Sequence, residues 1–383
     1  MLSLGLKILI GNRTSFIGVI FGVFLATLLI SQQSAIFLGL VSRSYRMVTD
    51  IPAPNLWVMD AATESVDKLR DMPEQYLDYV RSAAGIEWAV PLGLTQASLI
   101  TQSGIFEICE MYGIDDVSLI GAPNEMIEGS INDLRRSGAV IIDIHSAKGI
   151  LAAPQPDGTT IPLKVGDEVE INNRHAIVVG ICNVTPSFYP RPFVFTSLTE
   201  FRLFNPALAN NISFIAAKTL PDVDVEEVIK SINLRPGITA MTSEQFKDKI
   251  TDFFLKTGIL INFGLSVALG IIIGFSISGQ IFYTLTMENL MYYALIKSLG
   301  GTHRMLLMII MAQALLAGLL GYVLGTGVTL LWGEAIENTT LAFLFPWQLL
   351  LFTGGIILSI CLATAALCVH KVYSADPKVL LGN

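Results

Sequence analysis

Four long stretches of apolar residues, separated by more polar sequence, dominate the pattern of this chain. They cover residues 15–40, 257–287, 305–333 and 346–369, and none of them contains Asp, Glu, Lys, Arg or His. A helix needs about 20 mostly apolar residues to cross the hydrocarbon core of a bilayer. Each stretch meets that length, so we predict four membrane-spanning helices. The first is too long for the apolar part of a cleaved signal peptide and is predicted to stay as an anchor.

The sequence between the first two spans, residues 41–256, has the shorter and more polar pattern of a water-facing domain. Alternating or β-branched runs predict strands, and a helical spacing of apolar residues predicts helices. The expected strands are 55–60, 87–91, 139–144 and 238–241, with a hairpin over 165–184 that turns at Asn172 and Asn173, and the expected helices are 73–84 and 223–232. The strand–helix–strand pattern near both ends suggests two related α/β lobes around a β-rich insert. The predicted fold class is therefore an α-helical membrane protein with a large mixed α/β (α+β) ectodomain between its first two spans.

The end of this domain, residues 242–256, has the pattern of a helix that leads into the second span. Thr242 and Gln245 have the spacing of a capping box, which marks a helix start. One face of the expected helix carries Phe246, Ile250, Phe253 and Phe254. No Gly or Pro interrupts the sequence before Gly258, which predicts one continuous helix of about 40 residues, or about 60 Å. Such a helix could act as a rigid stalk that carries force, and the alternative is an ordinary amphipathic connector.

The charges are concentrated in the same water-facing domain. Only 15% of the 383 residues are charged and the mean hydropathy is +0.60. Residues 41–256 hold 18 of the 24 Lys and Arg and 28 of the 32 Asp and Glu, a net charge of −10, whereas the rest of the chain has a net charge of +2. This distribution excludes a simple cytosolic enzyme, a disordered chain and a basic nucleic-acid binder.

The few basic residues outside that domain predict how the chain crosses the membrane. Lys and Arg concentrate in short cytoplasmic segments. Basic residues precede the first span, lie between the second and third, and follow the fourth, at Lys7, Arg13, Lys297, Arg304, Lys371 and Lys378. Both termini (1–14 and the 370–383 tail) and the 288–304 loop are therefore predicted to be cytoplasmic. The 41–256 domain and the short 334–345 loop, which has no Lys or Arg, are predicted to lie outside an inner membrane that the chain crosses several times.

Small residues recur at four-residue spacing in the spans. Such spacing lets helix backbones approach closely. The candidate packing residues are the glycine pairs Gly18 and Gly22, Gly270 and Gly274, and Gly321 and Gly325. We expect them to form packing faces, either within the chain or across a dimer.

Motifs for chemistry are missing from the sequence. It has no GxxxxGK[ST], GxSxG or HExxH motif and no CxxC pair, so neither a nucleotide site nor a metal site is expected. Cys109 and Cys182 are either a disulfide or two free buried thiols. Asp143 and His145 give only a weak catalytic hint, and a structural histidine is the better interpretation. The spans also lack the ionisable residues that ion-coupled transporters use, so no path for hydrophilic ions is expected.

Three segments and the layout of the spans carry a resemblance to a known family. One span, a large outer domain and then three more spans form the layout of the MacB/FtsX/LolC-type permeases, the type VII ABC transporters. The cytoplasmic segment YALIKSLG over Tyr293–Gly300, followed by GTHR, is similar to the family's segment after the second span. The tail SADP over 374–377 and FRLFNP over 201–206 resemble the DevC-type exporter permeases in particular.

In that family a short helix in the cytoplasmic loop docks on a separate or fused ATPase. The resemblance assigns this coupling role to Glu288, Tyr292, Tyr293, Ile296, Lys297, Leu299, Gly300, His303 and Arg304. Tyr292 stands where members commonly have an acidic residue, and Ile296 stands at the usual Leu position. An apolar helix that ends at two glycines, between two spans, also suits a docking element. The alternative from the residues alone is a helix that lies on the bilayer.

The resemblance implies a permease subunit without enzymatic activity or cofactor of its own, since the partner ATPase binds ATP. Domain motion would follow ATP binding and hydrolysis (mechanotransmission), and would export a lipid, a glycolipid or another amphiphile. The implied partners are the ATPase, a second permease in a homodimer or heterodimer, a periplasmic adaptor, an outer-membrane channel and membrane lipid. Two alternatives remain: FtsX-like signalling to a cell-wall hydrolase, and LolC-like release of lipoproteins.

Overall fold

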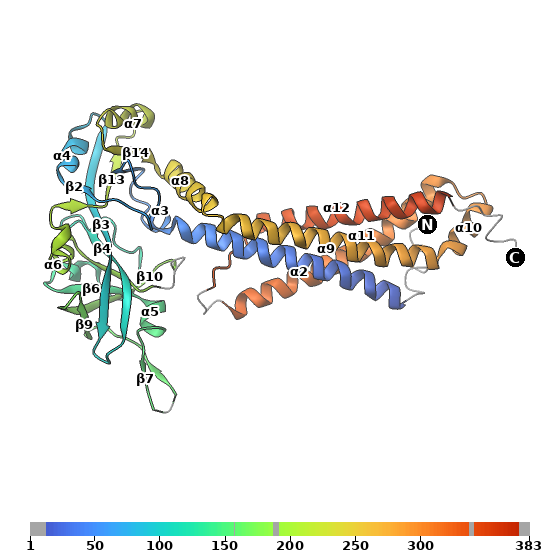
Figure 1. Ribbon diagram of the computed structural model, residues 1–383, viewed down its shortest axis with the longest axis horizontal. Helices are drawn as coiled ribbons and strands as arrows, with labels where there is room; N and C mark the ends of the chain where they lie inside the picture. The colour runs from blue at the N-terminus through green and yellow to red at the C-terminus, as the bar shows by residue number, and fades with distance from the viewer. Residues whose placement is uncertain (1–12, 157, 187–190, 337–340, 375–383) are drawn as a thin grey trace. The chain divides into compact units, whose positions relative to one another are not determined.

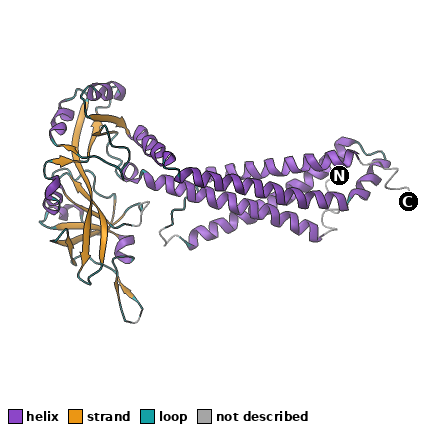
Figure 2. Ribbon diagram, viewed as in Figure 1, coloured by secondary structure: helices purple, strands orange, loops and turns teal. Residues whose placement is uncertain are grey.

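The computed structural model describes residues 13–156, 158–186, 191–336 and 341–374, and it divides into two compact units. One unit combines residues 1–40 with 258–383, and we call it the helical unit. The other contains residues 41–257, and we call it the mixed unit because it holds both strands and short helices. All strands of the described part of the chain belong to the mixed unit (Figure 2).

The helical unit is a bundle of long helices that run alongside one another (Figure 1). Its members are α2 (Arg13–Ser44), α9 (Ile259–Glu288), the short α10 (Leu290–Ser298), α11 (His303–Ala335) and α12 (Trp347–Ser374). Among the described residues, four of these helices, α2, α9, α11 and α12, are long and apolar enough to cross a membrane. The predicted fold class, with four spans and a mixed domain after the first, is confirmed.

Glycines let the helices of this bundle approach closely. A Cβ atom added at Gly321 would lie 2.7 Å from the side chain of Val23, and one at Gly325 would lie 2.6 Å from that of Thr27. Both glycines belong to α11 and both contacts are with α2. Gly18 and Gly22 of α2 face α9 in the same way, and Gly270 and Gly274 of α9 face α2. The six predicted packing glycines therefore contact helices of the same chain, so they do not require a dimer.

The first part of the mixed unit is an antiparallel sheet with the strand order β14-β1-β13-β3. Helices α4 and α7 cover one of its faces through a core that includes Leu77, Val80, Ile229 and Ile232. Outside this sheet, β2 and β12 form a two-stranded ladder. The elements of this part are α3 (Arg46–Asp50), β1 (Leu56–Asp60), β2 (Met72–Pro73), α4 (Gln75–Ser82), β3 (Ile86–Thr101), β12 (Asn211–Ile212), β13 (Phe214–Thr219), α7 (Val225–Asn233), β14 (Ile238–Thr242) and α8 (Ser243–Lys256).

The second part is a closed ring of strands, which the sequence pattern did not predict. β3 pairs with β4, and the pairing continues through β11, β6, β10 and β9 back to β3, with β5 added beside β10. Outside the ring, β7 and β8 pair only with each other. The elements of this part are β4 (Phe106–Ile114), β5 (Glu125–Gly129), η1 (Ile131–Arg135), β6 (Ala139–Asp143), α5 (Ile144–Lys148), β7 (Ala153–Pro154), β8 (Thr160–Ile161), β9 (Glu168–Ile171), β10 (Arg174–Asn183), β11 (Phe193–Ser197), α6 (Leu198–Phe204) and η2 (Pro206–Leu208).

Strand β3 belongs to both parts. Its first half, Ile86–Leu92, pairs with β13 of the sheet, and its second half pairs with β4 of the ring. Opposite glycines Gly93 and Gly113 lie at the changeover, and added Cβ atoms there would lie 2.6 and 2.5 Å from the ring of Phe201. The two glycines thus make room for α6 to pack on the strands.

The expected division of this unit into two lobes needs correction. The strand–helix–strand segments at the two ends of the domain do not form two related lobes. They join one sheet, in which β1 lies between β13 and β14. The hairpin at Asn172 and Asn173 is confirmed, and both residues have the positive φ (46° and 63°) that its tight turn requires.

The predicted continuous stalk is also wrong. The capping box of Thr242 and Gln245 is confirmed, but α8 ends at Lys256 and α9 begins at Ile259. Gly258 between them has φ +80°, a left-handed conformation that interrupts an α-helix. The sequence before Gly258 is helical as expected; the error lay in treating this glycine as an interior residue of the helix.

Candidate coupling site

Helix α10 is the candidate coupling element, and its two faces differ in exposure. Tyr293 and Ala294 are buried, at 1% and 6% exposed, and pack in the core of the bundle. Met291, Tyr292, Leu295 and Leu299 are 49–81% exposed. A short helix with one anchored face and one exposed apolar face can present a surface to a partner.

A hydrogen bond inside the bundle anchors α10. The hydroxyl of Tyr293 donates to Oε1 of Gln313 on α11 over 2.9 Å, and both residues are buried. Just before α10, the side-chain amide of Asn289 donates to the carbonyl of Leu285 over 2.8 Å. Burial raises the pKa of Tyr293 to about 12, so its hydroxyl keeps its proton at physiological pH. These contacts fix the orientation of α10 relative to α9 and α11.

The end of α10 is shaped by the two glycines that the sequence singled out. The N–H of Gly301 donates to the carbonyl of Ile296, and that of Gly300 donates to Lys297, over 2.9 and 3.1 Å. Gly300 has φ +90°. These two bonds form a Schellman motif, which needs a residue in the left-handed region just after the helix. The glycines therefore stop α10 and let the chain turn into α11.

The predicted coupling residues divide into several groups. Tyr292, Leu299 and Gly300 lie on the exposed surface, as do Glu288 at the end of α9 and Arg304 at the start of α11. Ile296 is half-buried and packs against the bundle, and Lys297 is half-buried. The side chain of His303 lies outside the described residues. The placement of Tyr293 on the docking surface is corrected, because its side chain is inside the bundle.

Sequence reasoning missed three residues of this region. Met291 and Leu295 complete the exposed apolar stripe with Leu299, and the spacing of four residues between them was the signal that could have found it. Gln313 is the third, a buried amide in a predicted span. A polar residue in a span calls for a partner, but the sequence did not show that the partner is Tyr293.

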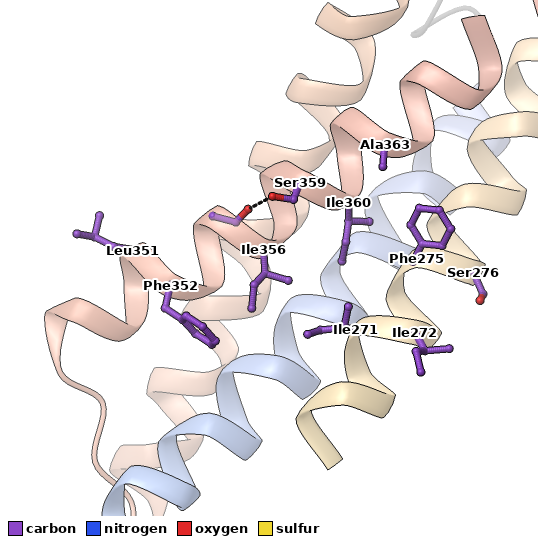
Figure 3. Close-up of a pocket in the computed structure, with 11 residues that line it drawn as sticks. Ile271, Ile272, Phe275, Ser276, Leu351, Phe352, Ile356, Ser359, Ile360 and Ala363 are labelled. Carbon is purple, nitrogen blue, oxygen red and sulfur yellow. Dashed lines mark hydrogen bonds between the residues drawn. The ribbon is translucent and has the colours of Figure 1, made fainter. Parts of the chain in front are cut away.

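The spans also form a lateral groove between α9 and α12. It has a volume of about 790 Å³ and an apolar lining that includes Ile271, Phe275, Ile356 and Ile360 (Figure 3). Two hydroxyls, of Ser276 and Ser359, interrupt this lining, and that of Ser359 donates to the carbonyl of Gly355 over 2.8 Å. The lining contains no charged side chain, so the groove offers nothing to a hydrophilic ion.

In the mixed unit, the predicted stalk residue Phe246 packs in a cluster of aromatic side chains. The ring of Phe246 on α8 lies 5.9 Å from Trp57 and 5.8 Å from Phe214, measured between ring centroids. Nε1 of Trp57 donates to Oγ of Ser243 over 3.1 Å. Ile250 and Phe254 are buried and Phe253 is half-buried. The predicted stalk face therefore holds α8 on the mixed unit.

A buried ion pair fixes the segment through which the chain enters the mixed unit. Arg46 of α3 binds Glu110 of β4, and both side chains are less than one-tenth exposed. The guanidinium lies 3.8 Å from the centre of the Phe193 ring, which adds a cation–π contact. α3 also packs on α8. The segment where the chain enters the mixed unit, α3, is therefore in contact with the segment where it leaves, α8.

The residues considered for catalysis or a disulfide are either buried and hydrogen-bonded, buried as free thiols, or exposed to solvent. Asp143 is buried, and its two carboxylate oxygens accept from the N–H groups of Ser146 and Phe193. His145 is exposed. Cys109 and Cys182 are both free and buried, which decides between the two alternatives for this pair. Burial raises the pKa of the Cys109 thiol to about 12, so the thiol is not reactive.

Comparison with known proteins identifies the family from two successive matches along the chain. Residues 14–234 match the model of the MacB-like periplasmic core domain, and residues 262–377 match that of the FtsX-like permease C-terminal domain. No curated protein matches the chain. Solved structures similar to it include the periplasmic region of MacB from Actinobacillus actinomycetemcomitans, at 16% identity over 53% of this chain and 95% of that one, with a TM-score of 0.38. Another is the extracellular domain of the ABC-type transporter YknZ from Gram-positive bacteria, at 12% identity over 49% and 98%, with a TM-score of 0.35.

The first family match covers more than half of the chain, and the second covers most of what remains. The chain therefore belongs to the MacB/FtsX-type permeases of ABC transporters.

Proposed function

We propose that this permease transmits the work of a separate cytoplasmic ATPase to its periplasmic domain, the mixed unit. The observation that carries the proposal is the two-sided helix α10. Its exposed apolar residues can dock on a partner, while the buried bond from Tyr293 to Gln313 ties the helix to the membrane bundle. A push on α10 is then passed to α11 and not lost in a flexible loop.

The proposed orientation places α10 and both termini in the cytoplasm, with the mixed unit in the periplasm and the bundle in the inner membrane. The basic residues Lys297 and Arg304 near α10 support this orientation. Movement of the bundle reaches the mixed unit through the two covalent connections, the end of α2 and the Gly258 segment. We propose that two permease chains, identical or different, act with two ATPase subunits.

The proposed substrate class is a lipid, a glycolipid or another amphiphile, taken from the periplasm or the outer leaflet. The predicted spans contain no Asp, Glu, Lys, Arg or His, and the groove between α9 and α12 has an apolar lining, so neither favours a hydrophilic ion. Export through a periplasmic adaptor and an outer-membrane channel, as the similarity to the DevC-type permeases implies, completes the proposal.

The docking role of α10 can be tested by co-purification from native membranes. We expect an ABC ATPase to co-purify with the wild-type chain and to be lost when Leu295 and Leu299 are both changed to Ala. Leu344→Ala is the matched control, because Leu344 is 44% exposed in the loop at the other end of the spans and Leu295 is 49% exposed. Equal recovery of the ATPase from all variants would refute docking through α10. Recovery of a cell-wall hydrolase in place of an adaptor would refute export.

A further inference from the structure

A polar cleft in the mixed unit lies where two parallel strands end. β6 and β10 are parallel neighbours, and His145 and Asn183–Pro186 lie at or just beyond their carboxyl ends. The end of α3 at Asp50 and the start of β5 at Asn124 and Glu125 complete the cleft. It has a volume of about 350 Å³ and is lined by Asp50, Asn124, Glu125, His145, Asn183 and Thr185, among others. Crevices at the carboxyl ends of parallel strands are frequent ligand sites, because side chains from several loops converge there.

Hydrogen bonds hold the polar side chains of this cleft in place. Nδ2 of Asn183 donates to Oε2 of Glu125 over 2.7 Å, and Nδ2 of Asn124 donates to the backbone carbonyl of Asp50 over 2.6 Å. The carboxylate of Asp50 accepts from the hydroxyl and the backbone N–H of Thr185, over 2.9 and 3.2 Å. The amide nitrogens already bind protein oxygens, so the lining has a surplus of acceptors over donors.

The charge of the cleft is negative. Among the described residues, the lining includes two carboxylates and the imidazole of His145, and no Lys or Arg. Arg46, one turn before Asp50, forms its ion pair with Glu110, which does not line this cleft. Burial raises the pKa of Asp50 in spite of the Thr185 bonds and the attraction of Arg46. Part of the solvation of this carboxylate is therefore lost and not replaced, and a bound cation would replace it.

The geometry favours an organic cation over a metal ion. Within the described ranges, no group of three or more His, Cys, Asp and Glu side chains is arranged to hold a metal. An ammonium group has three N–H donors and one positive charge, and so it matches separated carboxylate and amide oxygens without close convergence of ligands. Val184 and Pro186 add an apolar wall on which the carbon chain of such a ligand can pack.

We propose that this cleft binds a primary ammonium group, carried by a soluble amine or by the headgroup of an aminolipid. The proposal is independent of the ATPase partner and of the coupling role of α10. Failure of one leaves the other unaffected.

The test uses the full chain in phosphatidylcholine nanodiscs, with ethanolamine and ethylene glycol as probes. These two molecules differ by the replacement of a charged amine with a hydroxyl. In saturation-transfer NMR titrations we expect saturable binding of ethanolamine and none of ethylene glycol. Glu125→Gln should weaken ethanolamine binding by about fivefold, because one partly exposed ion pair is lost.

The matched control is Glu128→Gln, since Glu128 is an exposed residue of the same strand that does not line the cleft. Gln at position 125 can still accept the bond from Asn183, so the fold of the cleft is preserved. Equal binding of both probes, no saturable ethanolamine binding, or equal weakening by the two variants would overturn the proposal.

A second arm distinguishes the two sources of the amine. Part of the phosphatidylcholine is replaced by phosphatidylethanolamine in the nanodiscs. A loss of binding of free ethanolamine identifies the lipid headgroup as the ligand that reaches the cleft. Unchanged binding identifies a soluble amine.

Discussion

The bond between Tyr293 and Gln313 gives a sharp test of how α10 is held. Changing Tyr293 to Phe removes one hydroxyl and keeps the ring, which fills the same space in the bundle core. Gln313 then loses the 2.9 Å bond to its Oε1 at a position that is only 3% exposed. Because the hydroxyl keeps its proton at physiological pH, the loss should be the same from pH 6 to pH 9.

The magnitude follows from the burial of both partners. A buried acceptor that loses its donor costs about 1–3 kcal/mol in soluble proteins. Bonds between helices of membrane proteins are weaker, with a mean of about 0.6 and a maximum of about 1.7 kcal/mol in double-mutant cycles. Tyr293 belongs to α10, outside the four spans, although its side chain packs into their bundle. We therefore expect a value between these two ranges, so that Tyr293→Phe lowers the free energy of unfolding by about 1 kcal/mol.

The control lies one residue away. Tyr292→Phe makes the same chemical change at a side chain that is 58% exposed, and it should leave stability unchanged. Reversible unfolding of the full chain in mixed micelles measures both variants, and a double-mutant cycle with Gln313→Leu gives the interaction energy of the pair. Equal effects of the two Tyr variants, or an interaction energy of zero, would show that this bond does not anchor α10.

Three further predictions concern packing and charge. Glu110→Gln leaves Arg46 buried without its carboxylate and should destabilise the mixed unit by about 3 kcal/mol in thermal or chemical melts; a change below about 1 kcal/mol would contradict a tight pair. Gly321→Leu should impair assembly of the helical unit, because an added Cβ at this position meets α2. Gly327→Leu in the same helix should be tolerated, because an added Cβ there meets nothing within 4 Å. Thermal stability in detergent compares the two variants, and equal stability would contradict the prediction. Asp50→Asn should reduce the pH dependence of stability. Burial raises the folded-state pKa of Asp50, so the wild type loses stability as pH rises from the ordinary pKa of Asp through the raised one. A stability difference between wild type and variant that stays constant over that pH range would contradict this expectation.

Much of the helical unit could be predicted because lipid restricts which sequences can span it. A spanning helix has to be apolar over its whole length, so its composition alone reveals it. The same uniformity hides which face points inward. Tyr292 and Tyr293 are adjacent and chemically identical, yet one is exposed and the other is buried. Only the packing of α10 against α11 distinguishes them, and this depends on contacts between residues far apart in the chain.

Local signals in the mixed unit were also sufficient for single elements. The capping box at Thr242 and the turn at Asn172 and Asn173 depend on neighbouring residues, so the sequence contains them in full. The ring of strands depends on β9 pairing with both β10 and β3, and no local pattern encodes a pairing with β3 so far along the chain. The break at Gly258 was missed because one glycine inside a helical pattern is often tolerated.

The position of β1 has a consequence for how the chain folds during synthesis. Its two neighbours in the sheet are β13 and β14, and Leu56 pairs with Ala217 on one side and Thr242 on the other. The ribosome must therefore complete residues 61–242 before this apolar strand is paired on both edges. The strands of the ring all lie within residues 86–197, so they can assemble earlier. Until β13 and β14 are made, the apolar strand β1 (LWVMD) stays unpaired and prone to aggregation. A nascent chain stalled before β13 is therefore expected to bind a chaperone.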